Sequence, residues 1–159
     1  MFLFSNERCS GFTLVELVLV ITIVAVLAAF AVPRFFDNQV FDERAYHDEL
    51  IGAIRYAQKV AVGSGCSVRV DIAAAGYDLT QQTALAGHCD PADTSFPVPV
   101  LLPDGQTMSG ATPPGVTAGP AVAIVFDALG STDLAANQLL NVGARSFTIQ
   151  AESGLVLTP

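Results

Sequence analysis

A long apolar run begins at Phe12, and the hydrophobic period of the chain changes after it. From Phe12 as far as Pro33 the only charged residue is Glu16. As an α-helix this run would measure about 31 Å, which matches the hydrocarbon core of a bilayer. We therefore predict a transmembrane helix over residues 12–33, preceded by a short polar leader, residues 1–11.

A second helical pattern follows, over residues 34–63. Apolar residues recur there at three- and four-residue steps, which is typical of an amphipathic helix. The predicted buried stripe consists of Phe36, Val40, Leu50, Ile54, Ala57 and Ala61. His47 lies on an acidic stretch of this helix, and we expect it to be solvated. Because proline removes one helical hydrogen bond, Pro33 should kink the helix without necessarily ending it, so that one helix could run from about Phe12 to about Val62.

After Gly65 the hydrophobic period becomes two, which indicates β-strands. Cys66, Val68, Val70 and Ile72 fall on one face of the first predicted strand. Further strands are predicted at residues 77–80 and 121–126, with a terminal hairpin formed by 146–150 and 154–158. The proline-rich region 86–120 is expected to be a long loop with one strand near 98–102. The order of one long helix followed by an antiparallel sheet predicts an α+β fold, with a β-rich globular domain over residues 64–159.

The β-rich part is acidic. From residue 66 to the end there are two basic and eight acidic residues. Such a surface repels phosphate backbones, so we expect no nucleic-acid partner. Solubility alone also accounts for a charge of this sign.

Three cysteines are present: Cys9, Cys66 and Cys89. If the chain is cut at Gly11, Cys9 leaves and an even pair remains. On the outer side of a membrane the pair Cys66 and Cys89 can oxidise, and the disulfide would stabilise the fold by about 3 kcal/mol. The alternative is two buried free thiols.

The sequence contains no pattern typical of an enzyme. There is no G-x-S-x-G, no nucleophile with a recognisable base and no phosphate-binding loop. His88 next to Cys89 lacks the spacing of a zinc site, and Asp127 is interpreted as a turn residue. We therefore expect no catalytic residue, no metal site and no cofactor.

The stretch G-F-T-L-V-E at residues 11–16, with the apolar run and Pro33 behind it, resembles the prepilin signal of type IV pilins and type II secretion pseudopilins. The resemblance implies that a prepilin peptidase cuts between Gly11 and Phe12 and methylates the new amine of Phe12. It also implies that Glu16 is the glutamate used in filament assembly.

The placement of Glu16 has a physical rationale. An unpaired carboxylate in lipid costs several kcal/mol. The free amine that cleavage creates on Phe12 of one subunit could neutralise Glu16 of another, so the cost of the lone charge would drive assembly and set its register. The alternative is a glutamate that reaches the headgroups, since it lies only four residues inside the run.

Two further stretches resemble narrower groups of the same proteins. Residues 34–66 resemble the C-type minor pilin of mannose-sensitive haemagglutinin (MSHA) pilus systems. V-F-D-A-L-G at 125–130 and S-F-T-I-Q-A-E-S-G-L-V at 146–156 resemble the H-type pseudopilin and FimT-like family. The resemblance implies a single-pass protein of the bacterial inner membrane with a periplasmic globular domain, whose partners are the prepilin peptidase, other pilin or pseudopilin subunits and an inner-membrane assembly platform.

We therefore expect a minor pilin that assembles into an MSHA-type pilus or its tip complex. One alternative is the H-type pseudopilin of a type II secretion system. Another is a tip module that is adhesive through residues 86–120, or that binds DNA, although the acidic charge argues against DNA. An ordinary signal-anchored enzyme would retain residues 1–11 and tolerate replacement of Glu16.

Overall fold

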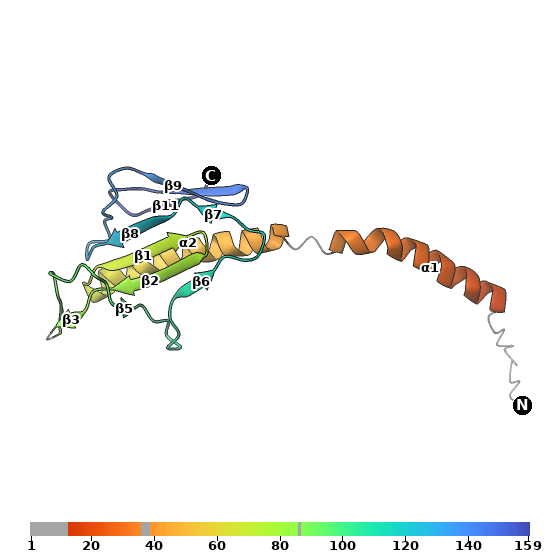
Figure 1. Cartoon of the computed structure of the whole chain (residues 1–159), viewed down its shortest axis with the longest axis horizontal. Helices are drawn as coiled ribbons and strands as arrows, with labels where there is room; N and C mark the ends of the chain where they lie inside the picture. Colours follow the sequence, from red (N-terminus) through yellow and green to blue (C-terminus); the bar gives the residue numbers. More distant parts are fainter. Residues whose placement is uncertain (1–12, 36–38, 86) are drawn as a thin grey trace, which may run out of the picture. The chain divides into compact units, whose positions relative to one another are not determined.

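The computed structural model describes residues 13–35, 39–85 and 87–159. The chain forms two compact units, residues 1–38 and 39–159. The first contains helix α1, Leu14–Phe35, and the second contains helix α2, Gln39–Ser64, with all the strands (Figure 1). The one long helix that the sequence predicts is thus described as two helices, and residues 36–38, between them, lie outside the described residues.

Helix α1 begins in the way its sequence dictates. Thr13 is its N-cap: the Thr13 hydroxyl accepts a hydrogen bond from the Glu16 backbone amide at 3.2 Å, and the Thr13 carbonyl accepts one from Leu17 at 3.1 Å. Pro33 lies within the helix, which extends to Phe35. The expected kink at Pro33 stays a prediction.

The apolar side chains of α1 that are described are exposed, from Leu14 to Leu27. Among the described residues, no helix is long and apolar enough to cross a membrane. The span 12–33 and its boundaries stay a prediction.

Helix α2 buries one face in its own unit. The predicted stripe is confirmed at Leu50, Ile54, Ala57 and Ala61, which Tyr46, Ala53 and Ile51 extend. The prediction was wrong at two positions. Val40 lies in the first turn of α2, before the buried residues of this helix begin at Tyr46, and is 60% exposed. His47 is only 6% exposed because its ring packs edge-on against Phe147, with ring centroids 5.5 Å apart.

Two larger sheets and one two-stranded sheet belong to this unit (Figure 1). The first has the order β5-β2-β1-β8, with β6 also paired to β2, and all its pairings are antiparallel. Its strands are β1 Val68–Ala73, β2 Gly76–Gln81, β5 Val98–Pro99, β6 Ser109–Ala111 and β8 Val122–Phe126. The alternation predicted for β1 is confirmed, since Val68, Val70 and Ile72 are buried.

The second sheet has the order β11-β10-β9-β7 and is also antiparallel. Its strands are β7 Ala118–Gly119, β9 Gln138–Val142, β10 Arg145–Ile149 and β11 Val156–Leu157. The predicted terminal hairpin is confirmed as β10 and β11. A separate two-stranded hairpin joins β3, Ala84–Leu85, to β4, His88–Cys89.

The core lies between α2 and the sheets. Its largest fully buried side chains include Tyr46, Leu50 and Ile54 from α2, and Phe126, Leu140 and Phe147 from the strands. The predicted α+β fold with a helix packed on antiparallel strands is confirmed. Because α2 supplies one wall of the core, the helix and the β-rich part from residue 64 onward fold as one unit.

The region 86–120 has more structure than the sequence predicts. The single strand expected near 98–102 is present as the short β5, but β4, β6 and β7 also lie in this region. Each has only two or three residues, too few for a hydrophobic period to be visible. β6 is held on β2, where Gly110 lies opposite Tyr77.

Candidate functional site

The N-terminal site predicted from the sequence is described only in part. Gly11 and Phe12 lie outside the described residues. Glu16 lies in the first turn of α1, and its side chain is exposed. Along Leu14–Phe35 the only other charged residue is Arg34, so Glu16 is an isolated carboxylate at the N-terminal end of an apolar helix.

A local role for Glu16 was missed in the sequence. Thr13 and Glu16 form the T-x-x-E spacing of a capping box, and the Thr13 hydroxyl does accept the Glu16 amide. A carboxylate in the first turn also interacts favourably with the positive end of the helix dipole. The Glu16 amide and the charge of its carboxylate therefore both favour the start of α1 within a single chain.

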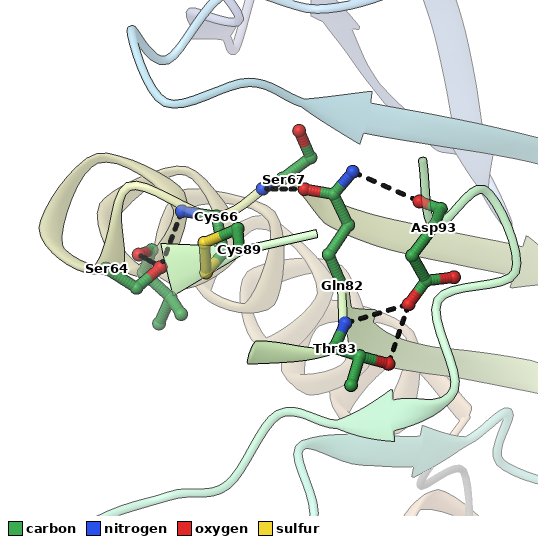
Figure 2. Close-up of a disulfide and its surroundings, with 8 residues drawn as sticks. Ser64, Cys66, Ser67, Gln82, Thr83, Cys89 and Asp93 are labelled. Carbon is green, nitrogen blue, oxygen red and sulfur yellow. Dashed lines mark hydrogen bonds between the residues drawn. A yellow bond between two sulfur atoms is a disulfide. The ribbon is translucent and has the colours of Figure 1, made fainter. Parts of the chain in front are cut away.

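The predicted Cys66–Cys89 pair is a disulfide, with Cα atoms 5.3 Å apart (Figure 2). It ties the β3–β4 hairpin to the segment that follows α2. Cys66 is held at this position by Ser64, whose hydroxyl accepts a hydrogen bond from the Cys66 amide at 3.2 Å. The prediction of a disulfide rather than two free thiols is confirmed.

Asp93 fixes the segment around the β3–β4 hairpin, residues 82–97, at a second point. Its carboxylate accepts four hydrogen bonds, two from the amide and hydroxyl of Thr83 at 2.8 Å and two from Ser95, at 2.9 Å from the amide and 2.7 Å from the hydroxyl. The bonds from Thr83, then Ser95, lower the pKa of Asp93 far below its usual range. Apart from the turn propensity of aspartate, no sequence pattern predicts this pairing.

Gln82 joins the segment 82–97 to Ser67, the residue that precedes β1. Its side-chain oxygen accepts a hydrogen bond from the Ser67 amide, and its nitrogen donates to the Asp93 carbonyl, both at 3.1 Å (Figure 2). Among the described residues of 82–97, none belongs to the hydrophobic core cluster. Polar bonds and one disulfide therefore hold this loop in place of apolar packing.

Hydrogen bonds of two buried tyrosines, Tyr46 and Tyr77, hold α2 against the first sheet. The Tyr77 hydroxyl donates to Glu49 at 2.7 Å, and the Thr112 hydroxyl bonds that of Tyr46 at 3.1 Å. Burial, and then the bond to Glu49, raise the pKa of Tyr77. A Cβ on Gly110 would lie 2.6 Å from the Tyr77 ring, so only glycine lets β6 pass this close to it.

His47 has a polar partner on one side only. Its Nδ1 lies 3.0 Å from the Asp48 carboxylate, and this hydrogen bond lowers the pKa of Asp48. Its Nε2 is buried and has no hydrogen-bond partner among the described residues.

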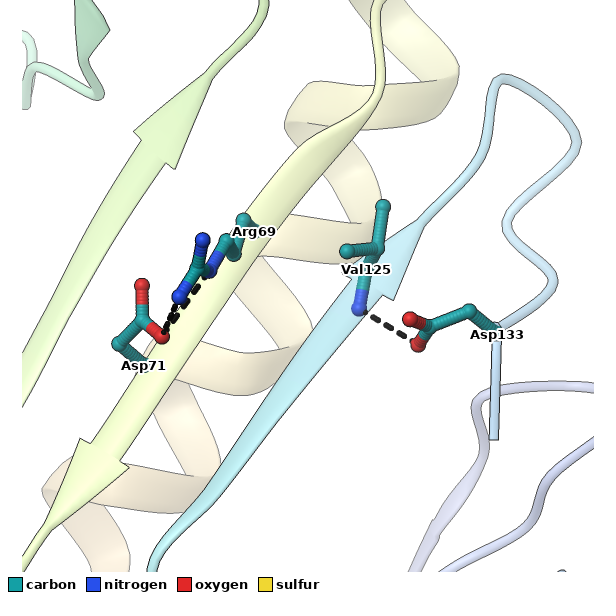
Figure 3. A network of polar contacts seen from close by, with 4 residues as sticks. All are labelled: Arg69, Asp71, Val125 and Asp133. Atoms are coloured by element: carbon teal, nitrogen blue, oxygen red, sulfur yellow. Dashed lines mark hydrogen bonds and ion pairs between the residues drawn. The ribbon is translucent and has the colours of Figure 1, made fainter. Parts of the chain in front are cut away.

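The exposed face of β1 carries an ion pair. Nε and Nη2 of Arg69 donate to one Asp71 oxygen at 2.9 and 2.6 Å (Figure 3). Nearby, Asp133 accepts a hydrogen bond from the Val125 amide of β8 at 2.8 Å. Asp127 organises the following turn by accepting the amides of Leu129 and Ser131, so its interpretation as a turn residue is confirmed. Within the described residues, no group of three or more His, Cys, Asp or Glu side chains is placed to hold a metal ion.

An apolar helix that begins with an isolated glutamate, followed by an α+β unit, is the organisation of a pilin-like subunit, and residues 7–32 match the prokaryotic N-terminal methylation motif. Residues 47–155 match the family described as Type II transport protein GspH, and the chain belongs to this family. Pilin and pseudopilin family members are structural subunits that assemble with one another, and the methylation motif implies processing by a prepilin peptidase.

A curated relative is the type IV narrow pilus major component PilA5 of Thermus thermophilus. It is 44% identical over 54 residues, which are 34% of this chain. The match spans about half, 47%, of the relative's own length.

Two crystal forms of the type IV minor pilin FimU of Pseudomonas aeruginosa are similar in structure. Their TM-scores are 0.48 and 0.49, with sequence identities of 14% and 13%. The matches cover 73% and 77% of this chain and 91% of each FimU chain.

Proposed function

We propose that this chain is a minor pilin subunit, processed by a prepilin peptidase and assembled into a type IV pilus of the MSHA type or its tip complex. The observation that carries the proposal is the combination of the methylation motif over residues 7–32 with a GspH-like domain over 47–155. The exposed apolar side chains of α1 support it, because such a surface needs lipid or other apolar helices around it.

In this proposal the peptidase cuts between Gly11 and Phe12 and methylates the amine of Phe12. The α1 segment, with Pro33 as a kink, anchors the subunit in the inner membrane, and the unit from Gln39 onward is periplasmic. An inner-membrane platform then adds the subunit to the filament. Glu16 of one subunit pairs with the Phe12 amine of another, which removes the cost of an isolated charge in an apolar surrounding.

The alternative favoured by a specific observation is a pseudopilin of a type II secretion system. Its support is the family description, which names type II transport. The 44% identity to a type IV pilus component supports the pilus instead, although it covers only 54 residues. Deleting the gene for this chain separates the pilus from the secretion system. Loss of surface filaments with normal secretion supports the pilus, and loss of secreted enzymes supports the pseudopilus.

The first experiment is the intact mass and N-terminal peptide of the protein from native membranes. We expect a chain that begins at N-methyl-Phe12 and lacks residues 1–11. A chain that still begins near Met1, in cells with an active prepilin peptidase, would contradict the proposal and favour a signal-anchored protein.

One variant of Glu16 and one of Thr13 separate assembly from helix capping. Glu16→Gln keeps the backbone bond to Thr13 and removes the charge, whereas Thr13→Ala removes the cap and keeps the charge. We expect Glu16→Gln to be processed and membrane-bound but poorly incorporated into filaments, and Thr13→Ala to be incorporated nearly as well as wild type. Normal incorporation of Glu16→Gln would remove the proposed pairing.

A further inference from the structure

Two loops lie together over the last turns of α2: residues 127–133 and 150–155, here named the Gln58 loops. The Gln58 side-chain nitrogen donates to the carbonyls of Gly130 and Ser153, each at 2.8 Å. A Cβ on Gly130 would lie 3.1 Å from the Val62 side chain, and one on Gly154 would lie 2.9 Å from the Gly130 carbonyl oxygen. The two loops therefore touch each other and the helix at one place.

Hydrogen bonds within each loop fix its shape. In the first, the Asp127 carboxylate accepts the amides of Leu129 and Ser131 at 2.9 Å, and the Gly130 amide donates to the Asp127 carbonyl at 2.9 Å. In the second, the Gly154 amide donates to the Gln150 carbonyl at 2.9 Å. A surface ordered in advance loses little conformational entropy when a partner binds it.

These ordered loops present apolar side chains to solvent. Leu129 is 87% exposed, more than any other large apolar side chain of the described residues. Val62 and Leu155, beside Gly130 and Gly154, are 54% and 51% exposed. The tip of a turn is normally polar, and the Leu129 side chain is not needed for the turn, which is made by its backbone amide. Exposed apolar side chains gathered on and beside two touching loops are typical of an interaction site.

The charges around this patch limit what can bind it. The Gln58 loops carry Asp127, Asp133 and Glu152 and no basic residue. The nearest base along α2 is Lys59, one turn before Val62. Negative loops repel nucleic acid, anionic lipid headgroups and the same patch of a second copy. The partner that fits this patch is therefore a protein surface that has an apolar hollow with lysine or arginine at its rim.

We propose that the Gln58 loops and Val62 form a docking surface for a neighbouring subunit of different sequence, whose contact region is an apolar hollow rimmed by lysine or arginine. This inference rests on the proposed function, because it assumes that the chain is assembled among other subunits. Leu129 is the anchor that enters the hollow, and Asp127 and Glu152 face the basic rim.

A photo-crosslinking amino acid at position 129 of the full-length chain, in cells that assemble filaments, tests the surface directly. The control is position 139, since Leu139 is also an exposed leucine, at 51%, but lies on β9, outside the Gln58 loops. We expect position 129 to crosslink to another pilin-like subunit, within a peptide that contains lysine or arginine, and position 139 not to do so. Crosslinks at 129 that go to lipid, to nucleic acid or to a second copy, or that do not exceed those at 139, would overturn the proposal.

Charge variants test the chemistry of the partner. We expect Leu129→Lys to reduce incorporation into filaments by about tenfold, and by more than Leu129→Asp does, because a lysine would meet the basic rim. Glu152→Lys should likewise reduce incorporation more than Glu152→Gln. Thermal unfolding of each purified full-length variant checks that the fold is kept, as the exposure of Leu129 predicts.

The outcomes separate this inference from the proposed function. If wild type and Leu129→Lys are incorporated equally well, the docking surface is overturned and the proposed function stands. If wild type is unprocessed and absent from filaments, the proposed function is overturned and the surface falls with it.

Discussion

The two helices are close in length but opposite in what they do with their apolar residues. α1 has 22 residues and α2 has 26. The described apolar side chains of α1 are exposed along Leu14–Leu27, whereas α2 buries a stripe from Tyr46 to Ala61. The difference lies in the distribution of apolar residues, because α1 is apolar on all its faces and α2 on one.

This comparison shows where each helix must find its stabilisation. A helix with one apolar face can bury it against a sheet of the same chain, and α2 does so. A helix that is apolar all round needs surroundings on every side, which one small α+β unit cannot supply. We therefore expect changes in α2 to alter the free energy of unfolding and, under the proposed function, changes in α1 to alter membrane anchoring and assembly.

Paired truncations of the two helices should give the largest contrast. Leu50→Ala in α2 removes a fully buried side chain and should lower the free energy of unfolding of the globular unit by about 2–5 kcal/mol. Leu19→Ala in α1 truncates a side chain that is 55% exposed and should leave that free energy nearly unchanged. Denaturant unfolding of the full-length variants in detergent measures both, and equal losses would contradict the division between the helices.

The disulfide should give the next effect. Replacing both Cys66 and Cys89 by serine removes a cross-link between residues that are 23 positions apart. The free energy of unfolding should fall by about 3 kcal/mol, mainly because the unfolded chain regains conformational entropy. Thermal unfolding of the double variant, with and without reductant, measures the loss. Reductant should destabilise wild type by breaking the disulfide and should leave the variant, which has none, unaffected. A loss of stability of the variant in reductant would show that something other than this disulfide is responsible.

A smaller, pH-dependent effect is expected at Asp93. Hydrogen bonds from Thr83 and Ser95 lower its pKa below the ordinary 3.8, so its ionised form stabilises the fold. This contribution is fully present above pH 3.8 and is lost as the pH falls through the lowered pKa. Asp93→Asn should therefore be less stable than wild type at pH 7, with a difference that shrinks in strong acid. A difference that is constant across a pH series of melting temperatures would refute the assignment.

Much of the fold was accessible from local patterns. The alternation of Val68, Val70 and Ile72 predicted β1, and the apolar run A-V-A-I-V-F at 121–126 predicted β8, because a strand of five or six residues is long enough to display its burial. β9 was missed, although Leu140 and Val142 alternate within it, since only two of its residues are buried. The short β6 and β7 have no period to detect, and their place is fixed by the strands they pair with.

For the candidate site, reading the residues in order was enough to find the isolated glutamate at position 16, the apolar run behind it and the Cys66–Cys89 pair. These depend on residue type and position along the chain, which the sequence states directly. The burial of His47 against Phe147 and the joining of two loops by Gln58 became visible only in the folded chain. The residues that Gln58 joins lie 72 and 95 positions away, and contacts over such separations depend on how α2 packs on the sheets, which no local pattern encodes.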